Sequence, residues 1–258
     1  MNRQEKLEKA RDERLGEIRK NNKGTIMKII EYKDCMNIIV EFQDEYRYRI
    51  ETRYDSFKNG QVGNPYDKTV YNIGYLGVGI YNEKDHKLAY GEWKGMLERC
   101  YDPYYINKKM TYKDCFVCDE WLCYQNFAKW FYENYYSIPN KKMRLDKDIL
   151  YKGNKIYSPE TCVFVTERIN SLFTKADKSR GKFPIGCAID GNKIRVRCCT
   201  LEKREELGRF PLNRPFQAFT CYKQFKEKYI KEVADEYKDL IPIELYEAMY
   251  RWEVEIND

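Results

Sequence analysis

The chain has 258 residues, of which 43% are hydrophobic, and its 47 Lys and Arg residues exceed its 41 Asp and Glu residues, so the net charge is +6. This length accommodates one large domain or two to three small ones. The 24 tyrosines favour thin modules with many half-buried positions, because each hydroxyl needs water or a partner. No run of 18 apolar residues occurs, so we expect no membrane span and no membrane partner.

The N-terminal part predicts a charged helix followed by a small β-module. Residues 2–20 place Leu7, Ala10 and Ile18 on one narrow stripe, which is typical of a surface helix. Residues 25–32 and 38–42 predict a hairpin, and residues 46–50 alternate as a third strand. We assign residues 1–22 to the helix and 23–80 to the β-module.

The centre, residues 81–174, predicts a mixed α+β domain. Two helices are expected at 90–99 and 121–135, with aromatic residues such as Trp93 and Trp130 facing the core. A short ββα unit is expected from Arg144 to Phe173.

The last part, residues 175–258, predicts a three-stranded sheet with helices. Strands are expected at 183–188 and 193–200, turned at Asp190-Gly191-Asn192, and a third ends at 207–210. Helices are expected at 215–238 and 242–250. The fold class is therefore α+β, with a small N-terminal β-module, a central ββα-metal-like domain and a C-terminal three-stranded sheet plus helix.

The positive charge is concentrated in one segment. From Lys175 to Arg214 there are eleven basic and five acidic residues, an excess equal to the net charge of the whole chain. Lys193, Arg195 and Arg197 alternate, so a strand places all three on one face. This pattern is typical of a surface that binds the phosphate backbone, and the alternative is a solvated face without a partner.

A motif in the centre points to phosphodiester chemistry. The motif comprises Leu145-Asp146-Lys147-Asp148-Ile149, the stretch from Gly153-Asn154 to Val165-Thr166, and Ile169-Asn170. It resembles the ββα-metal core of HNH endonucleases, and with Trp93, Cys118-Asp119-Glu120-Trp121 and Trp130 it resembles HNH-like phage proteins. The resemblance implies that Asp146 and Asn170 hold Mg²⁺ or Mn²⁺, and that Asn154 is the loop asparagine.

One departure from the HNH pattern bears on catalysis. Lys147 stands where the family has the histidine base, and a Lys with a pKa near 10.4 is a poor base at neutral pH. The only histidine, His86, lies outside the motif. Three alternatives follow: Asp148 replaces the base, Lys147 grips a phosphate without cleavage, or the ββα unit is a scaffold.

The ten cysteines predict free thiols. No apolar signal segment stands at the charged N-terminus, so we expect the reducing cytoplasm of a host cell. Cys115 and Cys118 form a CxxC that with Cys100 and Cys162 offers four zinc ligands. Because one CxxC is a weak signal, we expect buried thiols and no zinc.

The C-terminal part contains a second family pattern, carried by Phe183-Pro184-Ile185-Gly186, Ile194-Arg195-Val196-Arg197, Leu207-Gly208-Arg209-Phe210 and Ala218-Phe219. These segments resemble an Apetala-type DNA-binding domain, in which a three-stranded sheet packed on a helix enters the major groove. The resemblance implies that Lys193, Arg195, Arg197 and Arg209 contact duplex DNA. In the residues themselves, Ile194, Val196 and Cys198 alternate with the basic side chains and are expected to face the helix.

Two functions follow from the sequence. The first is a DNA-binding protein of a phage or mobile element, with an HNH-like centre that is weak or inactive in hydrolysis. The second is a non-enzymatic phage counter-defence protein that binds a host protein or nucleoprotein machine, which the tyrosine-rich composition favours because tyrosine is a common interface anchor.

Overall fold

The structure, a computed structural model, describes residues 2–173, 183–200, 202–256 and 258. The chain is mixed α+β, as the sequence predicts. Its contacts form two compact units, one comprising the chain up to Lys108 with Asp119–Lys129, the other comprising Lys109–Cys118 with Trp130–Asp258. The expected basic linker at 174–182, and with it the domain boundary at 174, lies outside the described residues.

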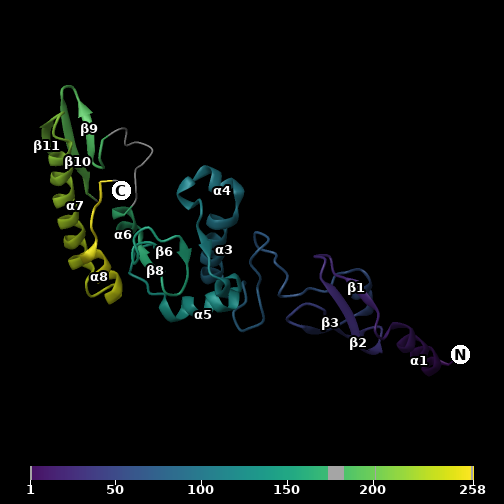
Figure 1. The fold of residues 1–258 in the computed structure, drawn as a ribbon. Helices are drawn as coiled ribbons and strands as arrows, with labels where there is room; N and C mark the ends of the chain where they lie inside the picture. Colours follow the sequence, from purple (N-terminus) through teal and green to yellow (C-terminus); the bar gives the residue numbers. More distant parts are fainter. Residues whose placement is uncertain (1, 174–182, 201, 257) are drawn as a thin grey trace. The chain divides into compact units, whose positions relative to one another are not determined.

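The first unit begins with a helix and a four-stranded antiparallel sheet of order β1-β2-β3-β4 (Figure 1). Alternate residues of the two central strands, with Phe57, form its core, because successive side chains of a strand point to opposite faces. The elements are α1 (Arg3–Arg14), β1 (Ile18–Lys20), β2 (Ile26–Asp34), β3 (Asn37–Phe42), β4 (Arg49–Thr52) and α2 (Tyr54–Lys58).

The helix expected over residues 2–20 is wrong in its second half. Helix α1 ends at Arg14, Gly16 adopts a φ of 84°, and Ile18–Lys20 pair with β2 as an edge strand. Glycine takes such a φ without steric cost, so the chain reverses here. The strand expected at residues 46–50 is also shifted, because Asp44 Oδ1 accepts the backbone N–H groups of Tyr46 and Arg47 and holds them in a turn.

The remainder of the first unit packs around tryptophan. The indole N–H of Trp93 donates to the carbonyl of Trp121 at 2.7 Å, and both rings are fully buried. Phe127 and Phe131 of the second predicted helix are also buried and Trp130 is half-buried, so its aromatic stripe contributes to the core, as expected. These side chains come from α3 (Lys87–Tyr101), the 3-10 helix η2 (Asp119–Leu122) and α5 (Tyr124–Asn134), and α4 (Pro103–Lys108) follows α3.

The second unit contains the predicted ββα motif. Strand β6 pairs antiparallel with β8, which leads directly into α6, and β5 pairs in parallel with β7. Ile149, Val165 and Ile169 share one core with the C-terminal helices. The elements are η1 (Met110–Tyr112), β5 (Phe116–Val117), β6 (Met143–Asp146), β7 (Ile156–Tyr157), β8 (Val163–Thr166) and α6 (Glu167–Leu172).

The C-terminal part of this unit is a three-stranded antiparallel sheet with one long helix along it (Figure 1). The strands run in the order β11-β10-β9, and α7 contacts all three. Here the three-stranded sheet plus helix matches the prediction. The elements are β9 (Cys187–Asp190), β10 (Lys193–Cys199), β11 (Arg204–Pro211), α7 (Pro215–Tyr237) and α8 (Ile243–Arg251).

The first hairpin of that sheet turns at Gly191 and Asn192, since Asp190 pairs with Lys193. Its first strand begins at Cys187 and not at residue 183 as expected. Gly186 explains the shift, because it has a φ of 76° and a Cβ there would lie 2.1 Å from the Tyr222 ring. Close packing on α7 therefore sets where the strand begins.

Candidate functional site

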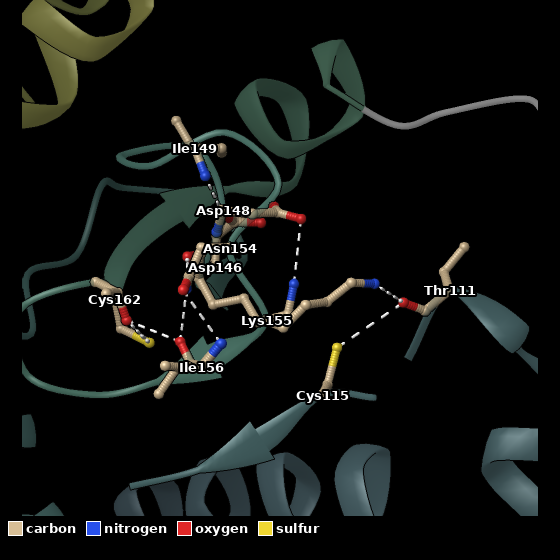
Figure 2. A network of polar contacts seen from close by, with 11 residues as sticks. Thr111, Cys115, Asp146, Asp148, Ile149, Asn154, Lys155, Ile156 and Cys162 are labelled. Carbon is tan, nitrogen blue, oxygen red and sulfur yellow. Dashed lines mark hydrogen bonds and ion pairs between the residues drawn. The ribbon is translucent and has the colours of Figure 1, made fainter. Parts of the chain in front are cut away.

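The ββα unit places the predicted acid at the end of a strand. Asp146 is the last residue of β6 and lies opposite Val163 of β8. Its Oδ1 accepts the backbone N–H groups of Asp148 and Ile149, each at 2.8 Å (Figure 2). One oxygen of this carboxylate therefore fixes the turn that follows the strand. Burial, followed by the neighbouring charge of Asp148, raises the pKa of Asp146 to about 6.

Lys147 is buried, with 6% of its surface exposed. Its Nζ lies 3.1 Å from Asp148 Oδ2 and 5.8 Å from the centre of the Tyr157 ring. Burial, the largest single influence, would lower the pKa of this ammonium, but Asp148, Cys115 and Asp146 together outweigh it and the pKa is raised. A charged lysine cannot accept a proton from water, so Lys147 in this state does not act as a general base.

Asn154 holds the loop that follows. Its amide donates to the carbonyls of Lys147 and Ile156, both at 2.7 Å, and its Oδ1 accepts from the N–H of Ile156 at 3.2 Å. Asp146, Asp148 and Asn154 thus lie in one small region (Figure 2), and hydrogen bonds join Lys147 to both Asp148 and Asn154. The side-chain amide of Asn154 therefore holds the backbone of the loop in place.

The residues expected to hold a metal are less well assembled. Asn170 lies in α6 and is half-buried, between Ile169 and Leu172, which face away into the core. Within the described ranges, no group of three or more His, Cys, Asp and Glu side chains is placed to hold a metal ion. The ammonium of Lys147 beside Asp148 further disfavours a second cation at this point. Metal binding by Asp146 and Asn170 stays a prediction.

The cysteines form no disulfide, and all ten lie in the described part of the chain. Cys115 Sγ lies 3.8 Å from the Thr111 carbonyl, which also accepts from Lys155 Nζ (Figure 2). Burial raises the pKa of the Cys115 and Cys162 thiols, whereas zinc requires thiolates. The absence of zinc nevertheless stays a prediction.

The C-terminal sheet separates an apolar face from a charged one. Ile194, Val196 and Cys198 of β10 are buried with Ala218 and Tyr222 of α7, as expected. The alternate residues therefore point to the face that α7 does not cover. Strand register places the following side chains there: Lys193, Arg195 and Arg197 on β10, Arg204, Glu206 and Arg209 on β11, and Asp190 on β9.

Two carboxylates hold the arginines of this uncovered face. Asp190 Oδ2 lies 3.5 Å from Arg195 and 3.3 Å from Arg209. Glu206 lies 3.0 Å from Arg209 Nε and 3.7 Å from Arg197. Five basic and two acidic side chains leave three positive charges in excess on the face. The buried Nε of Arg195 has no hydrogen-bond partner in the structure.

Sequence reasoning found the basic side chains of the sheet but not their acidic partners. Asp190 was read as a turn residue, although the two-residue hairpin places it opposite Lys193. Glu206 joins the face only because a β-bulge between Val196 and Arg197 shifts the register of β11. The hairpin signal would therefore have sufficed to place Asp190 on this face, whereas nothing in the local sequence pattern reveals Glu206.

None of the helices in the described ranges combines the length and hydropathy needed to cross a membrane. Comparisons of the chain with protein-family models, with curated proteins and with solved structures find no match.

Proposed function

We propose that the protein binds duplex DNA through the uncovered face of β9–β11. The observation that carries this proposal is the excess of positive charge on a sheet face whose opposite side is covered by α7. A two-stranded or three-stranded sheet fits the major groove of B-DNA, and arginine side chains contact both phosphates and guanine edges. The HNH-like and Apetala-like patterns of the sequence agree with this proposal.

The carboxylates within the face have a specific part in this proposal. Asp190 and Glu206 hold three arginines in place before DNA arrives, which reduces the entropy lost on binding. They also repel phosphate, so the face binds DNA more weakly than five free cations would. We therefore expect moderate affinity with a strong dependence on salt.

We further propose that the ββα unit supports this function as a scaffold without hydrolysing DNA. Lys147 is buried against Asp148, so the ammonium does not reach a phosphate on the surface. Asn154 and one oxygen of Asp146 are occupied by backbone groups. The hydrogen bonds of the motif thus serve the loop that joins β6 to β7.

A gel-shift titration with a 30-base-pair duplex, on the order of three helical turns, tests the binding proposal. Replacing Arg195, Arg197 and Arg209 by alanine is expected to weaken binding by about tenfold or more, since each phosphate contact contributes to affinity. A matched control removes three exposed charges from the helices of the same unit, at Lys228, Lys231 and Arg251. Equal affinity of the two triple variants contradicts the proposal.

Neutralising a carboxylate distinguishes a DNA surface from a structural charge network. Glu206→Gln removes a phosphate-repelling charge and retains a hydrogen-bond acceptor for Arg209. We expect this variant to bind DNA several-fold more tightly, because a rim charge of this kind shifts affinity by about 1 kcal/mol or less. A loss of binding would show that the network acts only by holding the fold.

A further inference from the structure

The first unit contains a pocket of about 580 Å³ beside its four-stranded sheet. This volume lies within the usual range of ligand sites, which is about 300–1,000 Å³. The lining is contributed by the turn between β1 and β2, the turn after β3, the loop at 66–75 and η2, and no residue of the DNA-binding face takes part. Tyr46, Tyr66 and Tyr75 give it an aromatic wall.

The three tyrosine rings form one cluster. Tyr46 and Tyr66 stack with ring centres 3.9 Å apart and planes 4° from parallel. Tyr75 lies 5.8 and 5.9 Å from them, tilted by 51° and 48°, and its hydroxyl lies 3.0 Å from that of Tyr46. Tyr46 is 41% exposed although it is a large aromatic residue. The Tyr46 and Tyr75 rings, held at a fixed angle to each other, can present the negative charge of their ring faces to a ligand.

Buried hydrogen bonds fix the walls of this pocket. Asp67, 9% exposed, accepts from Asn21 at 2.8 Å and from Thr25 at 2.5 Å. Asn64, 7% exposed, donates to Asp44 at 2.6 Å and accepts from the N–H of Tyr66. Because these bonds join the loop to the sheet, the tyrosines are held in place before a ligand arrives.

The charge of the pocket is opposite to that of the chain. Four carboxylates line it, from Asp44, Glu45, Asp67 and Asp119, against two ammonium groups, from Lys23 and Lys68. Asp67 is buried and Asp44 is half-buried, and both accept hydrogen bonds from neutral groups, so their negative charge is not neutralised by an ion pair. Glu45 and Asp119 are exposed at the rim and form no ion pair with any described residue.

We propose that this pocket binds an organic cation, the guanidinium or methylated ammonium group of a side chain in a basic partner peptide. The faces of aromatic rings attract such cations, and a net negative rim adds long-range attraction. A nucleotide would gain stacking on the tyrosines but would bring its phosphate to a pocket with excess negative charge. The pocket therefore gives the protein a second binding activity, separate from the DNA-binding face.

The test titrates the full chain, carrying ¹³C-labelled tyrosine, with tetramethylammonium and then with a nine-residue peptide that contains one trimethyllysine. The ring signals of Tyr46 and Tyr75 are expected to shift and saturate with both probes. Tyr46→Leu keeps an apolar side chain but removes the aromatic face, and is expected to weaken peptide binding about fivefold. Tyr104→Leu, at a tyrosine 75% exposed elsewhere in the same unit, is expected to change nothing.

A second variant keeps the proposal falsifiable should Tyr46→Leu disturb the fold. Glu45→Lys with Asp119→Lys reverses two exposed rim charges and is expected to abolish peptide binding while the thermal midpoint stays unchanged. Ring shifts that are absent with both cations would overturn the proposal. So would adenosine monophosphate shifting the same rings at lower concentration than the peptide, which would assign the pocket to nucleotides.

Discussion

The Nζ of Lys147 lies 3.1 Å from Oδ2 of Asp148, and the lysine is almost fully buried at the position where the HNH-like sequence pattern predicts a base. An ammonium beside a carboxylate stays charged, which prevents it from activating water. The same ion pair engages Asp148, which was the other candidate base. The pair therefore supports our proposal that this motif acts as a scaffold.

We expect no phosphodiester cleavage by the unmodified protein. Supercoiled plasmid incubated with Mg²⁺ or Mn²⁺ should be nicked no faster than in the presence of the Asp146→Asn variant, because the charged Lys147 cannot activate water and engages Asp148 in an ion pair. Gel electrophoresis of the plasmid measures this. Robust nicking that disappears in Asp146→Asn would instead identify a working nuclease with Asp148 as its base.

Asn154 is expected to matter for stability. Asn154→Ala removes two donated bonds to the Lys147 and Ile156 carbonyls and one accepted bond, so unfolding in urea should become easier by about 2–3 kcal/mol. Asn126→Ala, which loses a single exposed bond to the Glu120 carbonyl, is the control and should cost less than about 1 kcal/mol. Equal costs for both variants would show that the loop is not held by Asn154.

Asp146 predicts a pH dependence of stability. Its pKa rises from 3.8 unfolded to about 6 folded, so its stabilising contribution is complete below pH 3.8 and is lost as the pH rises through 6. Asp146→Asn should therefore match the wild type near pH 3.5 and exceed it by about 1–3 kcal/mol at pH 7.5. Urea unfolding across this range measures the difference.

The neighbouring acid provides the control for that experiment. Asp148→Asn leaves the buried ammonium of Lys147 without its counter-charge, so this variant should be less stable than the wild type at pH 7.5. A gain of stability in both variants would show that general charge repulsion, and not the burial of Asp146, causes the effect.

Removal of metal is expected to leave the fold unchanged. The Cys115 and Cys162 thiols are buried and protonated, so treatment with a strong chelator should not alter the thermal midpoint. Differential scanning calorimetry with elemental analysis tests this. One zinc per chain together with a large fall in the midpoint would make Cys115 and Cys118 ligands after all.

The sequence predicted the elements whose signals are local. Alternation in β10 and the glycine turn at Gly191 identified the C-terminal sheet and its two faces. Strand β1 was missed because three residues after a helix carry no pattern of their own, and their pairing with β2 is non-local. The turn at Tyr46 was missed because its alternation mimics a strand, while Asp44 supplies the hydrogen bonds that override it.

In the candidate sites, too, the features with local signals were predicted and those that depend on non-local contacts were not. The basic residues of β10 were found from spacing alone, since a strand period decides which face they share. The burial of Lys147 was not foreseen, because its partner Asp148 and the ring of Tyr157 come together only through the β6–β7 loop. The tyrosine pocket was foreseen only as an unusual composition, since its residues come together from four separate segments.

The most direct test of the account is the salt dependence of duplex binding. Affinity is measured by fluorescence anisotropy over a range of KCl concentrations, and the slope of log K against log salt counts displaced counterions at about 0.9 per phosphate contact. The variant with alanine at Arg195, Arg197 and Arg209 should lose roughly three units of slope, and the Lys228, Lys231 and Arg251 control should lose none. Equal slopes for the wild type and the sheet variant would contradict the account.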